Sequence, residues 1–184
     1  MSIYIETPRL YIRELLPTDD EGMFEMDSDP AVHRYLGNTP VTSIERSREV
    51  IAIIRKQYED FGIGRWAVIK KRGDEFLGWT GFKFMDKPVN KRSEFLDFGY
   101  RFKSSCWKQG YGYESAVAAL DHGLNKLGFK DVYAMTDVEN AGSRRILEKL
   151  GFRYVETFPY DGSNYAWVDL GLPVTWYEYA GQKK

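Results

Sequence analysis

The spacing of hydrophobic residues changes several times along the chain. Apolar and polar residues alternate across 9–13, which predicts a half-buried strand. A helical period follows, in which apolar side chains share one face at Ile44, Ile51, Ile54, Tyr58 and Phe61. The remaining pattern predicts strands at 65–70, 76–84, 94–102, 132–138, 153–160, 164–170 and 174–179, and helices at 113–127 and 141–150.

Short polar motifs mark the ends of the predicted helices. Two Thr-x-x-Glu capping boxes, which begin at Thr18 and Thr42, predict the N-termini of the first two helices. Asp29-Pro30 predicts that the first of these helices stops there, because the residue before proline disfavours helical backbone. The sequence Lys-Leu-Gly-Phe closes both later helices, and its glycine, Gly128 or Gly151, supplies the left-handed residue after a helix.

The predicted order of elements is β-α-α-β-β-β-α-β-α-β-β. This order indicates a mixed α/β fold, with antiparallel hairpins first and a β-α-β crossover over 94–138. No Pro-, Ser- or Gly-rich linker divides the chain, so we expect one domain over 1–184.

Composition removes several kinds of chemistry. The chain has 184 residues, 26 Lys and Arg, 27 Asp and Glu, and a formal net charge of −1, which argues against a nucleic-acid partner. One Cys and two His exclude an intrachain disulfide, a Cys-rich zinc site and a three-His metal centre. The first residues do not resemble a signal peptide, and no stretch of about 20 apolar residues follows. We therefore expect a cytoplasmic protein with no membrane partner and no metal.

A glycine-bearing segment at 107–115 lies between a predicted strand and a predicted helix. We expect Gly110 and Gly112 to have positive φ, so that valine at 112 would be incompatible with the loop. The unsatisfied amides and the dipole of the following helix would then make a site for phosphate or pyrophosphate. The alternative is a turn that only starts a helix.

With these motifs in place, the sequence resembles the GNAT superfamily of N-acetyltransferases, and within it the RimJ/RimL branch of ribosomal-protein N-terminal acetyltransferases. The resemblance covers nearly the whole chain. The matching pieces are 7–13 (Thr-Pro-Arg-Leu-Tyr-Ile-Arg), 29–36 (Asp-Pro-Ala-Val-His-Arg-Tyr-Leu), 78–82 (Gly-Trp-Thr-Gly-Phe), 97–102 (Asp-Phe-Gly-Tyr-Arg-Phe), the Gly-x-Gly loop and Asn140-x-x-Ser143.

The resemblance implies acetyl-CoA as the acetyl donor. The family splays its fourth and fifth strands, here 94–102 and 132–138, and lays the pantetheine arm between them. This places the arm along the backbone of Gly99, Tyr100, Arg101 and Phe102. The pyrophosphate would lie on the amides of Gln109, Gly110, Tyr111, Gly112 and Tyr113, with Lys108 as a nearby cation. The side-chain amide of Asn140 would hold the pantetheine arm, although asparagine there also suits a helix N-cap.

The catalytic residues are also implied by the resemblance. A carboxylate on the fourth strand recurs as a base in the family, and the matching residue is Asp97; an ordinary strand residue is the alternative, and Glu94 lies nearby. Backbone amides near 99–101 would stabilise the oxyanion. Many members carry a Tyr that protonates the departing thiolate, but Leu147 occupies that position. Ser143 is then the candidate donor, with a small residue in the first helical turn as the alternative.

The acceptor implied by the resemblance is a primary amine, either a peptide or protein N-terminus or a small amine. His33, Tyr35 and Trp79 are candidates for lining its cleft, and 164–170 is a strand-like segment that could do the same. A homodimer stays open. Two other functions stay open as well: a catalytically inactive acyl-CoA sensor, and a Rossmann-type dinucleotide binder in which Ser115 replaces the third glycine.

Overall fold

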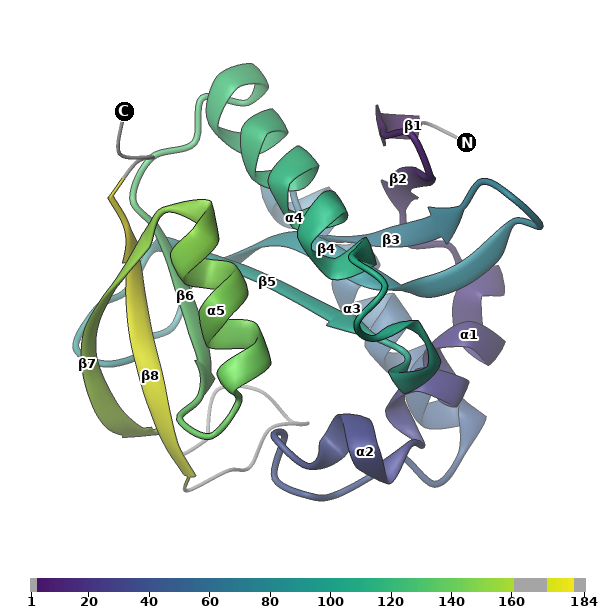
Figure 1. The fold of residues 1–184 in the computed structure, drawn as a ribbon, viewed down its shortest axis with the longest axis horizontal. Helices are drawn as coiled ribbons and strands as arrows, with labels where there is room; N and C mark the ends of the chain where they lie inside the picture. Colours follow the sequence, from purple (N-terminus) through teal and green to yellow (C-terminus); the bar gives the residue numbers. More distant parts are fainter. Residues whose placement is uncertain (1–2, 161–171, 181–184) are drawn as a thin grey trace.

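The computed structural model describes residues 3–160 and 172–180, and its eight strands form one mixed sheet in the order β1-β2-β3-β4-β5-β6-β8-β7 (Figure 1). The strands are β1 (Ile3–Glu6), β2 (Leu10–Glu14), β3 (Arg65–Lys70), β4 (Glu75–Met85), β5 (Phe95–Phe102), β6 (Val132–Asp137), β7 (Phe152–Tyr160) and β8 (Leu172–Tyr179). The helices are α1 (Asp20–Asp27), α2 (Pro30–His33), α3 (Ile44–Phe61), α4 (Tyr111–Asp121) and α5 (Ala141–Leu150), with short turns η1 (Pro17–Asp19), η2 (Ser104–Cys106) and η3 (His122–Lys126).

The pairing of the strands confirms the predicted mixed α/β fold. Neighbouring strands from β1 to β5 are antiparallel, and so are β6 with β8 and β8 with β7. Strands β5 and β6 are parallel, because α4 carries the chain back between them. This is the crossover that the sequence predicts over 94–138.

Helices cover both faces of the sheet (Figure 1). On one face, α4 and α5 pack on a core that includes Trp66, Phe82 and Phe98. On the other face, α1 and α3 pack on a second core that includes Met23 and Ile51. Side chains that alternate along β3, β4 and β5 therefore face two different environments.

The helix that leads into β6 is closely fitted to the sheet. A Cβ on Gly123 would overlap the ring of Phe82, so only glycine allows this approach. The helix changes from α to π hydrogen bonding at η3 and ends at Gly128, which has φ +70°. Phe129 then folds back on the helix: its amide donates to the carbonyl of Gly123 (2.9 Å), and its ring lies 5.0 Å from that of Phe82.

The N-terminal third differs most from the prediction. Strand β1 and helix α2 were not expected. Helix α1 stops before Asp29-Pro30, as predicted, but Pro30 also begins α2, because Asp29 caps that helix through the amide of Ala31 (2.8 Å). The capping box at Thr18 is wrong: the carboxylate of Asp19 accepts the amide of Leu16 (2.7 Å) and pairs with Arg13.

The second capping box is wrong by one residue, since α3 begins at Ile44 with Ser43 as its N-cap. The predicted strand at 164–170 lies outside the described residues. Within the described residues, no helix has the length and apolar character that crossing a membrane requires.

Candidate active site

A gap opens between the parallel strands β5 and β6. They pair only at Leu96–Val132 and Asp97–Tyr133, although β5 continues to Phe102 and β6 to Asp137. The remaining parts of the two facing edges are free of each other. Unpaired strand edges present rows of N–H and C=O groups, which is what an extended ligand needs to bind as an added strand.

The first turn of α5 borders this gap. The side-chain oxygen of Asn140 accepts the amide of Ser143 (3.0 Å), so Asn140 is an N-cap. The phenol of Tyr100 on β5 donates to the carbonyl oxygen of Ser143 (2.9 Å) and lies 3.3 Å from its hydroxyl. Burial raises the pKa of Tyr100, so the phenol stays protonated at neutral pH. The structure thus brings Tyr100, Asn140 and Ser143 together.

The glycine-bearing loop groups several backbone amides just before a helix. Lys108 (φ 61°) and Gly110 (φ 83°) have left-handed backbone, and α4 begins immediately afterwards at Tyr111. In the described part of the chain, the backbone amides of 108–113 donate to no other group, and the first such bond of the helix comes from Glu114 to Gly110 (3.0 Å). These amides and the helix dipole suit an anionic group.

The expectation for Gly112 is wrong. Gly112 lies inside the first turn of α4 and does not have positive φ. A Cβ there would sit at ordinary contact distance, 3.7 Å from Ile146 Cδ1 and from the ring of Phe102. The left-handed residues of the loop are Lys108 and Gly110, which lie four and two residues before Gly112.

Asp97 faces the opposite side of the sheet from Tyr100. The guanidinium of Arg65 pairs with its carboxylate and also donates to the carbonyls of Gly81 (2.6 Å) and Asp97 (2.8 Å). Lys83 is the β4 residue opposite Asp97. Burial raises the pKa of the Asp97 carboxyl, and the charges of Arg65 and Lys83 oppose that rise. Burial and the nearby Arg65 lower the pKa of Lys83 to about 7.

Trp79 lies beside this charged group and links it to the helices. The guanidinium carbons of Arg65 and Arg101 lie 5.0 Å and 5.2 Å from its ring centroid, within cation–π range. Arg101 also pairs with the buried carboxylate of Asp27 on α1 (2.8 Å). Trp79 is 6% exposed. Its ring is therefore held between two cations on the face that carries α1.

His33 lies at the end of α2 and not in a loop as expected. It is 4% exposed, and neither ring nitrogen has a hydrogen-bond partner within 3–160 and 172–180. Burial and the nearby Arg101 lower its pKa, while Asp27 and Asp29 work in the other direction. Tyr35 is half-buried next to Arg34, whose guanidinium lies 5.4 Å from its ring centroid. The structure places His33, and not Tyr35, beside the Arg101–Asp27 pair.

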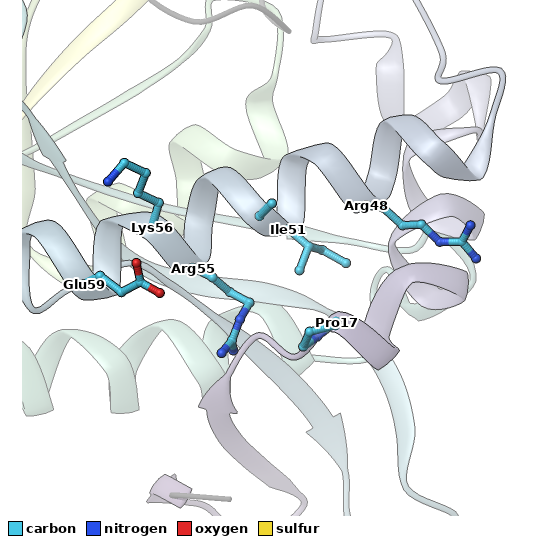
Figure 2. A pocket seen from close by; sticks show the side chains of 7 residues that line it. Pro17, Arg48, Ile51, Arg55, Lys56 and Glu59 are labelled. Carbon is cyan, nitrogen blue, oxygen red and sulfur yellow. The ribbon is translucent and has the colours of Figure 1, made fainter.

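Two further features are the residue Leu147 and a hollow along α3. Leu147 is 2% exposed and belongs to the core beneath α5. A hollow of about 300 Å³ lies along α3, against Pro17 (Figure 2). Its lining comes from α3 and η1 only, so it is separate from the β5–β6 gap.

Three features meet in the described part of the chain. The parallel strands β5 and β6 separate after two residue pairs, backbone amides without partners precede α4, and Asn140 caps α5 beside the gap. The family model described as the acetyltransferase (GNAT) domain matches residues 9–153. The chain belongs to the GNAT acetyltransferase family. It is therefore an acetyltransferase that uses acetyl-CoA, as members of this family do, and the resemblance seen in the sequence is confirmed.

Individual proteins agree with this assignment. The chain is 29% identical over 147 residues to the uncharacterized N-acetyltransferase p20 of Bacillus licheniformis, with 80% of each covered. The GNAT fold also matches solved structures. A GNAT-family acetyltransferase from Bordetella pertussis has a TM-score of 0.79 at 20% identity, covering 98% of this chain and 100% of that one. RimL, a ribosomal L7/L12 α-N-protein acetyltransferase in complex with coenzyme A, has a TM-score of 0.75 at 18% identity, covering 96% and 97%.

The Rossmann alternative is wrong. That fold is built on a mostly parallel sheet whose strand runs directly into the glycine turn. In the GNAT sheet described here, β5 with β6 is the parallel pair and the other pairings are antiparallel.

Several residues near the site were missed by the sequence interpretation. Arg65 and Lys83 come from strands other than that of Asp97, and Arg9 and Glu114 meet across 105 positions of sequence. The pairing of β3, β4 and β5 brings Arg65 and Lys83 to Asp97, whereas Arg9 and Glu114 meet where the start of α4 lies beside the residue before β2. The phenol of Tyr100 was also missed, since only its backbone was assigned to the cofactor.

Proposed function

We propose that residues 1–184 form one N-acetyltransferase domain, which transfers the acetyl group of acetyl-CoA directly to a primary amine in a ternary complex. The observation that carries the proposal is the unpaired length of β5 and β6 next to the free amides of 108–113. The first suits the pantetheine arm, along Gly99 to Phe102, and the second suits the pyrophosphate. Acetyl-CoA supplies the thioester and the sulfur leaving group, so the protein needs no nucleophile of its own.

The residues on the two sides of the β5–β6 region fit the two proton transfers. The amine nitrogen forms a bond to the acetyl carbon, the carbon–sulfur bond breaks, the amine loses one proton and the sulfur takes one. We assign the first proton to Asp97, whose raised pKa makes it a better base near neutral pH. We assign the second to the hydroxyl of Ser143, and the oxyanion to a backbone amide in 99–101.

The acceptor enters this scheme from the face of Asp97. His33 and Trp79 are our candidates for its cleft, because both lie beside the Arg101–Asp27 pair on that face. Tyr35 remains a candidate at the rim, being half-buried. The similarity in fold to RimL supports a peptide N-terminus as the first acceptor to test.

The test is acceptor-stimulated release of the coenzyme A thiol. Acetyl-CoA would be supplied with peptides that have free N-termini, with small amines and with aminoglycosides, and the matched control is each peptide with a blocked N-terminus. We expect thiol release with at least one free amine and none with its blocked form. Calorimetry with acetyl-CoA in parallel separates the second candidate, an inactive sensor, which would bind acetyl-CoA tightly and release no thiol with any amine.

A further inference from the structure

Arg9, just before β2, reaches the start of α4 through several contacts. Its Nε donates to Glu114 Oε2 (2.6 Å), its backbone amide donates to Glu114 Oε1 (3.2 Å), and its Nη1 donates to the carbonyl of Gln109 (3.0 Å). Its guanidinium carbon also lies 4.3 Å from the ring centroid of Tyr111. One side chain thus touches the loop, the first residue of α4 and the first-turn carboxylate.

Glu114 is fixed from a second direction. Thr7 donates its hydroxyl to Glu114 Oε1 (2.6 Å), and the same hydroxyl accepts the amide of Leu10 (3.0 Å). Burial would raise the pKa of Glu114, but the hydrogen bonds from Thr7 and Arg9 outweigh this and lower it, so the carboxylate is ionised. Charge-assisted hydrogen bonds of this kind are stronger than neutral ones. The segment 7–9 and the first turn of α4 therefore form one tied unit.

The loop that Arg9 holds has reason to need support. Lys108 is a non-glycine residue in the left-handed region, where its Cβ comes too close to the following carbonyl oxygen. Gly110 is left-handed as well, and a Cβ there would lie 3.3 Å from Arg9 Nη2. A side chain at position 110 would therefore make a tight contact with Arg9, whose guanidinium would have to shift slightly.

We propose that Arg9 is a positioning residue for the loop at 108–113, which it holds in the conformation that presents free amides to the diphosphate of coenzyme A. The inference rests on the proposed binding of coenzyme A at this loop. It assigns to the N-terminal segment a part in recognising the nucleotide end of the cofactor, which is distinct from the pantetheine arm. Arg9 acts through Gln109 and Glu114.

The test compares two ligands that share the pantetheine arm, of which only coenzyme A has the diphosphate and the rest of the nucleotide. Binding of coenzyme A is measured by calorimetry, and pantetheine, which has the same arm and no phosphate, is measured by its competition with coenzyme A. In Arg9→Ala we expect the Kd of coenzyme A to rise about 10- to 100-fold, the effect of losing charge-assisted hydrogen bonds, while that of pantetheine stays within about twofold. The expected kinetic result is a raised KM for acetyl-CoA with kcat nearly unchanged.

Three other variants separate positioning from charge and from folding. Arg9→Lys keeps the charge but not the planar fork, so we expect it to recover less than half of the lost affinity. Arg153 on β7 forms an exposed ion pair with Glu178 on β8 (3.4 Å), so Arg153→Ala should leave the Kd of both ligands unchanged. In the double variant Arg9→Ala/Glu114→Gln, the loss should be close to that of Arg9→Ala alone, because the two side chains act as one unit.

Three results would overturn the inference: an unchanged Kd for coenzyme A in Arg9→Ala, equal weakening of coenzyme A and pantetheine, or full recovery by lysine. Failure of the wild-type chain to bind coenzyme A at all would instead reject the proposed function. Thermal unfolding of each variant shows whether it is folded at the assay temperature.

Discussion

The phenol of Tyr100 donates a hydrogen bond to the carbonyl oxygen of Ser143 (2.9 Å), and this bond connects the splayed end of β5 to the first turn of α5. The hydroxyl oxygens of the two residues also lie 3.3 Å apart. The position of the proposed thiol-side donor is thus set from the opposite edge of the gap.

Removing the Tyr100 hydroxyl should slow the chemical step through Ser143. We expect Tyr100→Phe to lower kcat about three- to tenfold, with little change in the KM for acetyl-CoA, since a hydrogen bond contributes about 0.5–1.5 kcal/mol. The check is to measure Tyr100→Phe in both the wild-type and the Ser143→Ala backgrounds. If Tyr100 works through Ser143, the second background shows no further loss; an equal loss in both would show that it does not.

The two glycines near α4 should differ in their tolerance of a side chain. Gly110→Ala forces alanine into left-handed backbone and against Arg9 Nη2, so we expect a raised KM for acetyl-CoA and a loss of about 1 kcal/mol in unfolding free energy. Gly112→Ala, whose Cβ would meet only ordinary contacts, is the matched control. Helix propensity should leave it as stable as the wild type or more so. Equal KM values for the two variants would contradict the assignment of strain to Gly110.

Asn140 caps α5 and is also the donor that we propose for the pantetheine arm, and its aspartate variant separates the two. Asn140→Asp keeps the oxygen that caps α5 but removes the N–H donor proposed for the pantetheine arm. We expect the melting temperature to be maintained and the KM for acetyl-CoA to rise. Asn140→Ala should lose both, including about 1 kcal/mol of stability from the cap. If Asn140→Asp leaves the KM for acetyl-CoA unchanged, the proposed contact with the pantetheine arm is wrong and Asn140 only caps α5.

Asp97→Asn tests the proposed base through the pH dependence of the rate. General-base removal typically costs about 10²–10⁴ in rate, and the loss should be largest at low pH, where the amine does not deprotonate unaided. The nearby exposed carboxylate Glu94, changed to Gln, is the control and should leave the profile unchanged. Because the variant also leaves Arg65 with no charged partner at Asp97, stability must be measured in parallel. Parallel pH–rate profiles for wild type and Asp97→Asn would exclude Asp97 as the base.

Lys83 should make stability rise with pH above neutrality. Its pKa is lowered to about 7 in the folded chain, against about 10.4 when unfolded, so between these values the folded chain binds fewer protons. The free energy of unfolding then increases with pH, by at most about 1.4 kcal/mol per pH unit. Urea midpoints at pH 7, 8.3 and 9.5 for wild type and Lys83→Met measure this, and the slope should be smaller in the methionine variant. Identical slopes would mean that Lys83 does not titrate in this window.

The elements that were predicted well are those fixed by local signals. The strand at 65–70 and the helix at 141–150 have the predicted bounds, the latter because Asn140 caps it and Gly151, with φ 94°, ends it. The loop before α4 was located correctly, and Gly110 has the expected positive φ. The second left-handed residue is Lys108 and not Gly112, which a search for paired glycines does not find. Helix α2 was missed because Pro30 signals a helix start as well as a helix end.

The charged part of the site could not be predicted in the same way. Arg65 and Asp97 are 32 residues apart, and Lys83 reaches them only through the register of β4 with β5. Burial then sets the pKa of each group, and burial depends on how α1 and α3 cover that face. Sequence spacing does not show strand register or burial. The resemblance to the family pointed to Asp97 but not to its partners Arg65 and Lys83.

The tie between the N-terminal segment and α4 has a practical consequence for anyone who prepares this enzyme. The region matched by the family model starts at Arg9, but the hydroxyl that holds Glu114 belongs to Thr7. A version trimmed to the matched region would lose β1 and the Thr7 hydroxyl, and would keep only the Arg9 contacts to Glu114. We expect such a protein to bind acetyl-CoA more weakly than the full chain, so affinity tags belong at the other end of the chain.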